Sequence, residues 1–409
     1  MKKIGLPFGF FVAVLMLAEP AIARFDTAKF LSSAWRDPAV QMKEASRNEF
    51  GSSSFINPVE KMQLRLGQGH YVDQRKGSVR LYTRGFSEYR LMRGLRSQET
   101  QLEQTESQAQ LGKALSERYE ALLAYAHASE KRKLAASLLK SVSSSAGMTK
   151  LLTRASSASG ADLLKAKAST EEAQLDLAKA EMEEKLAVQI LASLDSGAVA
   201  GGEPMELLTP EQMLSNLDKL KLRSSGESSA VRLARAQAQL KRDEGFLDVE
   251  KDGRLIDYFE VSMSEDREER RYSLEVAINI PGFSGSDHKA RERSRSAVNY
   301  EIEAHEADRE NAQAATASRT TLEQFAATYR TLKSASETPG EERIKKLARN
   351  QDPLLAASLE RASAQRAMAL AEIHHSAAEA YLAYLVATDA LIDHPRTNFF
   401  SASLGEISP

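Results

Sequence analysis

The 409-residue sequence contains no cysteine, and this absence excludes disulfides, thiolate metal sites, cysteine nucleophiles and a lipid-modified N-terminal cysteine. Only 11 prolines and 21 glycines interrupt the chain, so we expect long uninterrupted elements. One tryptophan and 6% aromatic residues are little for one or two compact hydrophobic cores. These scarcities together favour one elongated unit over two or three globular domains.

The sequence also lacks a large charge of one sign, because its formal net charge is only -2. A nucleic-acid partner is therefore not expected. With 42% hydrophobic and 27% charged residues, the composition excludes a protein with several membrane-spanning helices, which needs several long apolar runs.

The N-terminus reads as a secretory signal peptide over residues 1–23. Lys2 and Lys3 precede an apolar stretch at residues 4–18, and Ala21-Ile22-Ala23 forms a small-residue cleavage site. The alternative is a retained N-terminal anchor, although the apolar stretch is short for a membrane span. We expect the mature chain to begin at Arg24 and to lie outside the cytoplasm.

The mature chain repeats one order of elements twice, over residues 24–222 and 223–394. Each copy has a short helical opening, two strands, a very long helix, a break and a second helix. The tripeptides Gly85-Phe86-Ser87 and Gly282-Phe283-Ser284 stand at the same place in both copies, where a strand gives way to a helix. Residues 197–210 form the linker, and no structure is assigned to the tail at residues 395–409.

The strands are predicted from period-2 alternation, at about 59–67 and 78–85 in the first copy and about 255–264 and 271–280 in the second. In the third strand, Phe259 and Val261 share a face with Asp257, whereas Ile256 and Glu260 lie on the opposite, polar face. Strands of this length can cross a bilayer in a barrel. The alternative is a hairpin on a soluble core, but the chain offers little for a hairpin to pack on. Such strands need other chains to close a barrel, because lipid tolerates no open edge.

The long helices are predicted at about 87–142 and 161–195, and at about 286–335 and 353–392. The predicted breaks are the serine-rich stretch at residues 143–147, followed by Ser156 to Gly160, and Thr338-Pro339-Gly340. Heptad-like spacing, as in Ala168, Leu175 and Met182, indicates coiled-coil packing. A soluble bundle or a dimeric coiled coil is the alternative, but helices of this length exceed those of ordinary bundles.

Three stretches resemble TolC-like outer-membrane efflux proteins, the outer membrane factors. They are Ala34-Trp35-Arg36-Asp37-Pro38, Ile278-Asn279-Ile280-Pro281-Gly282-Phe283-Ser284-Gly285 and Gly160-Ala161-Asp162-Leu163-Leu164-Lys165-Ala166, within the twofold order of elements. The resemblance implies a mostly α fold with membrane β-strands. It also implies a homotrimer in which each chain gives four strands to a shared twelve-stranded β-barrel, and long helical hairpins form a periplasmic α-barrel. The stretch at residues 350–355 departs from the family by lacking a glycine.

The resemblance implies an exit duct of a tripartite efflux pump or a type I secretion system. The duct would sit in outer-membrane lipid, as a protein without a lipid anchor. Its partners would be a periplasmic adaptor, or membrane fusion protein, and an inner-membrane pump. The rival interpretations are a periplasmic coiled-coil adaptor and a non-conducting structural envelope protein, and the cargo stays open.

No catalytic, cofactor or metal site is predicted. The stretch Gly282-Phe283-Ser284-Gly285-Ser286 nearly matches a nucleophile elbow, but residue 286 is serine where glycine is needed. His374 and His375 are adjacent on a helix and point about 100° apart, so we expect them at an interface or on the surface.

Two groups of charged residues are predicted to act in conduction. The polar strand faces would line the lumen and bias which solutes pass, through Lys61, Arg65, Arg80, Arg84, Glu260 and Glu275. The alternative is that some of these side chains only neutralise each other. The periplasmic helix tips would gate the duct through Asp162, Asp352, Arg154, Arg343 and Arg349.

Overall fold

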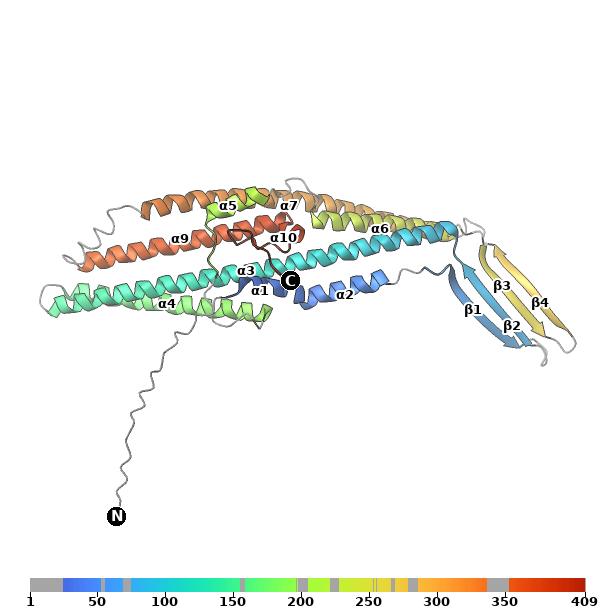
Figure 1. Ribbon diagram of the computed structural model, residues 1–409, viewed down its shortest axis with the longest axis horizontal. Helices are drawn as coiled ribbons and strands as arrows, with labels where there is room; N and C mark the ends of the chain where they lie inside the picture. The colour runs from blue at the N-terminus through green and yellow to red at the C-terminus, as the bar shows by residue number, and fades with distance from the viewer. Residues whose placement is uncertain are drawn as a thin grey trace, which may run out of the picture.

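The computed structural model shows a long layer of helices with a small β-sheet at one end (Figure 1). The described residues are 25–52, 56–68, 75–154, 159–195, 197, 205–220, 228–252, 254, 256–265, 269–278, 286–336 and 353–408. The predicted signal peptide, the second copy's Gly-Phe-Ser tripeptide and the predicted break at residues 338–340 lie outside this part of the chain.

The secondary structure follows the order predicted for the two copies. The helices are α1 (Thr27–Ser32), the 3₁₀ helix η1 (Ser33–Arg36), α2 (Pro38–Ser52), α3 (Phe86–Arg154), α4 (Gly160–Leu194), α5 (Pro210–Leu220), α6 (Ser229–Asp252), α7 (Ser286–Ser336), α9 (Pro353–Ala387) and α10 (Ala390–Asp393). The strands are β1 (Val59–Gln68), β2 (Arg75–Thr83), β3 (Ile256–Glu265) and β4 (Arg270–Ile278).

The strands form one four-stranded antiparallel sheet in the order β1-β2-β3-β4. The four predicted strands are therefore observed, with ends that differ by a few residues. The central pairing joins β2 of the first copy to β3 of the second, so the two copies share one continuous sheet.

One face assignment in β3 is wrong. The register shifts between Ile256 and Tyr258, and Ile256 lies opposite Ile278 on the apolar face instead of on the polar face. Asp257 is the extra residue of a β-bulge, which interrupts the period-2 alternation that the prediction extended through it. β1 has the same irregularity between Val59 and Lys61, so Glu60 is the corresponding extra residue.

α3 is a single helix of 69 residues, about 100 Å long, and the predicted break at residues 143–147 is wrong. Alanine favours a helix, serine lowers helix stability only slightly, and one glycine lowers it by about 1 kcal/mol relative to alanine. Packing on neighbouring helices offsets these small losses, so the helix continues through the stretch. Beyond the serines, the hydroxyls of Thr149 and Thr153 donate to the carbonyls of Ser145 and Thr149, which keeps these side chains within the helix.

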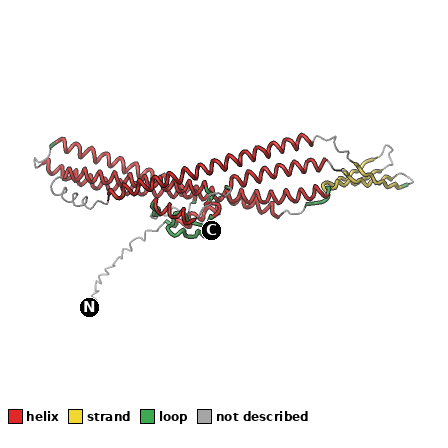
Figure 2. Tube along the Cα trace, turned by 90° about the horizontal axis from the view of Figure 1, so that it is seen from above, coloured by secondary structure: helices red, strands yellow, loops and turns green. Residues whose placement is uncertain are grey.

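α3 is the central element of the helix layer. It packs against α4 and α9 toward the end far from the sheet, and against α2 and α6 toward the sheet. α7 runs beside α6 and then beside α9 along the other side of the layer. Seen from above, the layer of helices is narrow (Figure 2). α1, α5, α10 and the C-terminus lie near the middle of the molecule (Figure 1). No helix in the described ranges is both long enough and apolar enough to cross a membrane.

The C-terminal tail, to which no structure was assigned, belongs to the main hydrophobic core. Phe399, Phe400 and Ile407 are buried there. The hydroxyls of Tyr119 and Tyr381 donate to the carbonyls of Thr397 (3.2 Å) and Phe399 (3.1 Å). The tail therefore joins α3 and α9 near the middle of the molecule.

The predicted helix at residues 353–392 is in fact two helices, because the chain turns at Asp389. This residue has φ 55°, in the left-handed region that ends an α-helix. Its carboxylate accepts hydrogen bonds from the backbone N–H and the hydroxyl of Ser229, the first residue of α6. The contact at this helix start compensates the unfavourable backbone conformation.

Candidate functional site

The sheet has one apolar and one polar face. Most large side chains of the apolar face are exposed, whereas Val79, Leu81 and Phe259 in the two central strands are half-buried. The exposed ones are Met62, Leu64, Leu66, Ile256, Val261, Met263, Tyr272, Leu274, Val276 and Ile278. Leu66 is 79% exposed and Tyr272 is 70% exposed, so neither packs on the rest of the chain. An exposed apolar surface of this extent indicates contact with another protein or with lipid.

The polar face consists of rows of directly opposed residues. From the hairpin ends toward the helices, the rows are Gly67, Lys76, Ser264, Arg271; then Arg65, Ser78, Ser262, Ser273; then Gln63, Arg80, Glu260, Glu275; and then Lys61, Tyr82, Tyr258, Ala277. The structure therefore brings Lys61, Arg65, Arg80, Glu260 and Glu275 to one face. Arg84, the sixth predicted residue, lies just beyond the end of β2 and donates to the carbonyl of Asn57.

Two of the predicted residues neutralise each other at the centre of this face. Arg80 Nε lies 2.7 Å from Glu260 Oε2, across the β2–β3 pairing. The guanidinium also lies 3.8 Å from the centre of the Tyr258 ring, which holds it flat on the sheet. These contacts leave Glu260 buried, at 9% exposure. The pair therefore links the two repeats of the chain, and little of its charge is accessible to a solute.

A second charged cluster, not predicted from the sequence, lies where the sheet meets the helices. Arg254 connects α6 to β3, and its guanidinium lies 2.7 Å from both Glu60 and Glu88. The Glu88 side chain is only 1% exposed. One arginine thereby ties the base of β1 to the start of α3. A lone arginine between two elements gives no sequence signal of this role.

At the opposite end, Asp162 takes part in capping a helix. It forms a capping box with Ser159 at the start of α4, and hydrogen bonds from the hydroxyl and backbone N–H of Ser159 hold the pKa of this carboxyl below its ordinary value. Arg154 is exposed at the last position of α3, and no ion pair joins it to Asp162 among the described residues. Asp352, Arg343 and Arg349 lie outside the described residues.

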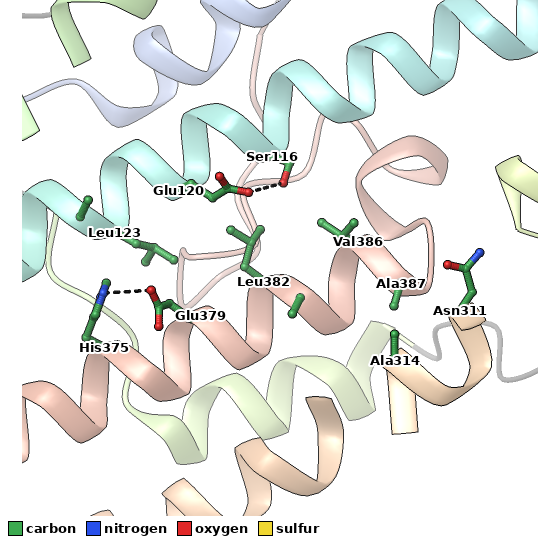
Figure 3. Close-up of a pocket in the computed structure, with 12 residues that line it drawn as sticks. Ser116, Glu120, Leu123, Asn311, Ala314, His375, Glu379, Leu382, Val386 and Ala387 are labelled. Carbon is green, nitrogen blue, oxygen red and sulfur yellow. Dashed lines mark hydrogen bonds and ion pairs between the residues drawn. The ribbon is translucent and has the colours of Figure 1, made fainter. Parts of the chain in front are cut away.

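A cavity of about 570 Å³ lies between α3, α7 and α9 (Figure 3). Its polar lining includes Glu120, Asn311 and His375, and His375 Nε2 lies 3.2 Å from Glu379 Oε1. His375 also stacks on His127 of α3, with ring centres 4.1 Å apart.

The adjacent histidines, expected at an interface or on the surface, both lie at contacts within the chain. His374 Nε2 lies 2.6 Å from the carbonyl of Leu208, and His375 faces α3. Burial, together with the neighbouring His375 and Lys131, lowers the pKa of His127 to about 4. The part of the chain that the structure describes contains no group of three or more side chains arranged to hold a metal ion.

Comparison with solved structures identifies several outer-membrane proteins with the same architecture. VceC of Vibrio cholerae superimposes with a TM-score of 0.69 at 12% identity, covering 88% of this chain and 95% of VceC. The MtrE outer membrane channel of Neisseria gonorrhoeae gives 0.63 at 17% identity, covering 88% of both chains. The CmeC outer membrane channel of Campylobacter jejuni gives 0.60 at 12% identity, covering 89% of this chain and 84% of CmeC.

No protein-family profile matches the sequence, and no curated protein sequence matches it. The likeness therefore shows the fold alone, since the identities are low. At that level the resemblance drawn from the sequence is confirmed, because the chain has the fold of outer-membrane channels over about nine-tenths of its length, with CusC covering 90% of it.

Proposed function

We propose that this protein is an outer-membrane channel, the exit duct of an efflux or secretion system. The observation that carries the proposal is the amphipathic four-stranded sheet, with its apolar face exposed and with β1 and β4 unpaired along their outer edges among the described residues. Strands of 9 and 10 residues match the length that crosses a bilayer at a barrel's tilt.

The open edges of the sheet support its closure into a β-barrel with the sheets of other protomers. Open strand edges cannot stand in lipid, because their backbone N–H and C=O groups would have no partner. Pairing β4 of one copy with β1 of the next satisfies both edges at once. Three copies arranged in this way form the twelve-stranded barrel of the proposed homotrimer, with the apolar face toward lipid and the polar face toward the lumen.

The helix layer supports the same assembly. α4 lies at one side of the layer and buries Ala173, Ala180, Ala187 and Leu191 within its own chain. Its other stripe, which includes Leu175 (63% exposed) and Met182 (71% exposed), faces away from the chain. The sequence suggested this larger stripe as a packing seam, and it is available to a helix of the neighbouring copy. Closure of the layers gives the periplasmic tunnel.

Several finer features of the proposal come from the sequence. Residues 1–23 would export the chain, and residues 24–222 and 223–394 would be its two repeats. A periplasmic adaptor and an inner-membrane pump would supply the energy, and an iris-like motion of the helix tips would gate the tunnel. Gating would involve Asp162, Asp352, Arg154, Arg343 and Arg349, and the capping box with Ser159 restrains the side chain of Asp162.

The test combines assembly and conduction. The protein, purified from detergent-solubilised outer membranes, should run as a trimer in native mass spectrometry and give discrete conductance steps in a planar bilayer. Because the chain has no cysteine, Leu274→Cys on β4 combined with Leu64→Cys on β1 reports closure directly. We expect oxidation to link the chains into trimers through disulfides. Met62→Cys and Leu66→Cys replace Leu64→Cys in two further variants, in case β4 and β1 of neighbouring chains pair in a register shifted by two residues. Each single-cysteine variant is the control.

The α4 stripe offers a matched pair of variants for the same experiment. Leu175→Gln with Met182→Gln should weaken the trimer, whereas the volume-conserving Leu175→Met with Met182→Leu should keep it. A soluble periplasmic monomer without conductance steps would contradict the channel and favour the adaptor. A membrane trimer without steps would favour the structural envelope protein.

A further inference from the structure

The polar face of the sheet carries more positive than negative charge. Its described positions include five cations, Lys61, Arg65, Lys76, Arg80 and Arg271, and two anions, Glu260 and Glu275. The excess of positive charge is concentrated toward the hairpin ends, where Lys76 and Arg271 share one row and Arg65 stands in the next.

Local ion pairs remove part of this excess. Arg80 is paired with Glu260, and Arg271 lies 3.0 Å from Glu269 in the β3–β4 turn. Lys61, Arg65 and Lys76 are exposed and form no ion pair within the described residues. Lys61 Nζ lies 6.0 Å from the centre of the Tyr82 ring, a contact that leaves its charge unneutralised. Among the described positions of this face, Glu275 is the one anion outside the Arg80–Glu260 pair.

The apolar face carries fewer charges. They lie in one row at the hairpin end, where Arg75, Glu265 and Arg270 are directly opposed. Arg270 Nε lies 2.9 Å from Glu265 Oε1, so this pair is internally neutral and Arg75 is the one further cation of the row. The larger positive excess of the sheet therefore lies on the polar face, with five cations against two anions.

Resting on the proposed function, we propose that the membrane segment of the lumen attracts anions, and that negatively charged solutes are the class it favours. In the closed trimer, each exposed cation becomes a ring of three, facing the solute path between low-dielectric walls. Charges so placed raise the local concentration of anions and lower that of cations.

The helix layer carries charges of its own at a different depth. Glu120 and Glu379 line the cavity between α3, α7 and α9, far along the layer from the sheet. Substitutions confined to the sheet therefore isolate the contribution of the membrane segment.

The test is the reversal potential of the full-length trimer in a planar bilayer with a KCl gradient. We expect the permeability ratio of chloride to potassium to exceed one. Combining Lys61→Gln, Arg65→Gln and Lys76→Gln should lower this ratio, by roughly twofold or more at 0.1 M salt, where the screening length is about 10 Å. Glu275→Gln should raise it, and 1 M salt should suppress both effects because screening shortens to about 3 Å.

Arg270→Gln is the matched control for Lys76→Gln, because the two residues lie one row apart at the hairpin end on opposite faces. It should leave the ratio unchanged. A wild-type ratio below one, or an equal response to Arg270→Gln and Lys76→Gln, would overturn the inference while the channel stands. Absence of any conductance would overturn the channel and this inference with it.

Discussion

Glu60 and Asp257 are acidic residues at the same place in two strands that are far apart in the sequence. Each is the extra residue of a bulge near the first residue of its strand, next to the junction with the helices. A bulge bends a strand and increases its twist, which turns the sheet relative to the helix layer. Glu60 also reaches Arg254, so the bend in the first copy is fixed by an ion pair.

The stacked histidines predict a dependence of stability on pH. The pKa of His127 falls to about 4 through burial, His375 and Lys131, from an ordinary value of 6.5, and the pKa of His375 is also lowered, first by burial. The unfolded chain therefore binds protons at a higher pH than the folded chain. The contribution of this pair to the free energy of unfolding is therefore fully present above about pH 6.5. It declines as the pH falls below that value, and levels off once the pH has passed through about 4.

The measurement is the melting temperature of the purified protein between pH 7.5 and pH 4. His127→Gln should flatten the decline, because it removes one of the two rings that must be protonated side by side. His305→Gln, at an exposed position of α7, is the control and should keep the wild-type slope. Identical slopes for all three proteins would show that the histidine pair does not control the acid response.

At the scale of the element, two of the three glycines of α3 have opposite surroundings. A Cβ added at Gly147 meets nothing within 4 Å, whereas one added at Gly112 would overlap Ile392 of α10. Gly147→Ala should raise the free energy of unfolding by about 0.5–1 kcal/mol, because alanine loses less backbone entropy in a helix. Gly112→Ala should lower it by about 1–3 kcal/mol, because the contact with α10 is already filled.

Both variants can be compared in one denaturant or thermal unfolding series. A destabilising Gly147→Ala would indicate that the helix bends or opens at the serine-rich stretch, as the sequence first suggested. The Gly112→Ala variant serves as the positive control for a loss of packing.

The elements also show how far the sequence determines the structure. Period-2 alternation predicted all four strands, because one face of each is apolar and the other polar. The alternation assigned Ile256 to the wrong face of the sheet, because a bulge adds a residue to the strand and leaves no mark in the sequence. On α4, the heptad spacing predicted a packing stripe through the larger residues Leu175 and Met182. The residues that α4 buries within the chain are instead alanines, such as Ala173 and Ala180. Periodicity identifies apolar stripes and does not say which neighbour covers each one.

The candidate site was predictable to a similar degree. Five of the six residues expected to line the lumen share one face because their strands alternate in phase. The pairing of Arg80 with Glu260 depends on the β2–β3 register between the two copies, which no local pattern specifies. The buried charge cluster at Arg254 was missed for the same reason, since its partners are more than 160 residues away in the chain.

At the scale of the whole molecule, Arg254 connects the sheet to the helix layer, and its loss should be costly. Arg254→Met leaves Glu88 buried without its counter-charge, which should lower the free energy of unfolding by about 3–5 kcal/mol. Arg242→Met is the control. It removes an arginine 2.5 Å from Glu301 in a pair that is about 40% exposed on both sides, and should cost less than about 1 kcal/mol.

Thermal unfolding of the solubilised protein measures both variants. Adding Glu88→Gln to Arg254→Met should recover part of the loss, because a neutral amide is cheaper to bury than a carboxylate. Equal effects of Arg254→Met and Arg242→Met would show that the junction does not depend on this buried pair.

The pairing of β2 with β3 has an evolutionary consequence. It joins the second strand of one repeat to the first strand of the other, which is the same kind of junction that β4 and β1 of neighbouring copies make in the proposed trimer. A half-length ancestor with a single hairpin could build the same ring from six identical copies. Fusion of two such genes would convert half of the junctions from encounters between chains into contacts within one chain. The two halves would then be free to diverge, as their polar faces have done. The first hairpin supplies Lys61, Arg65, Lys76 and Arg80, and the second supplies both anions, Glu260 and Glu275.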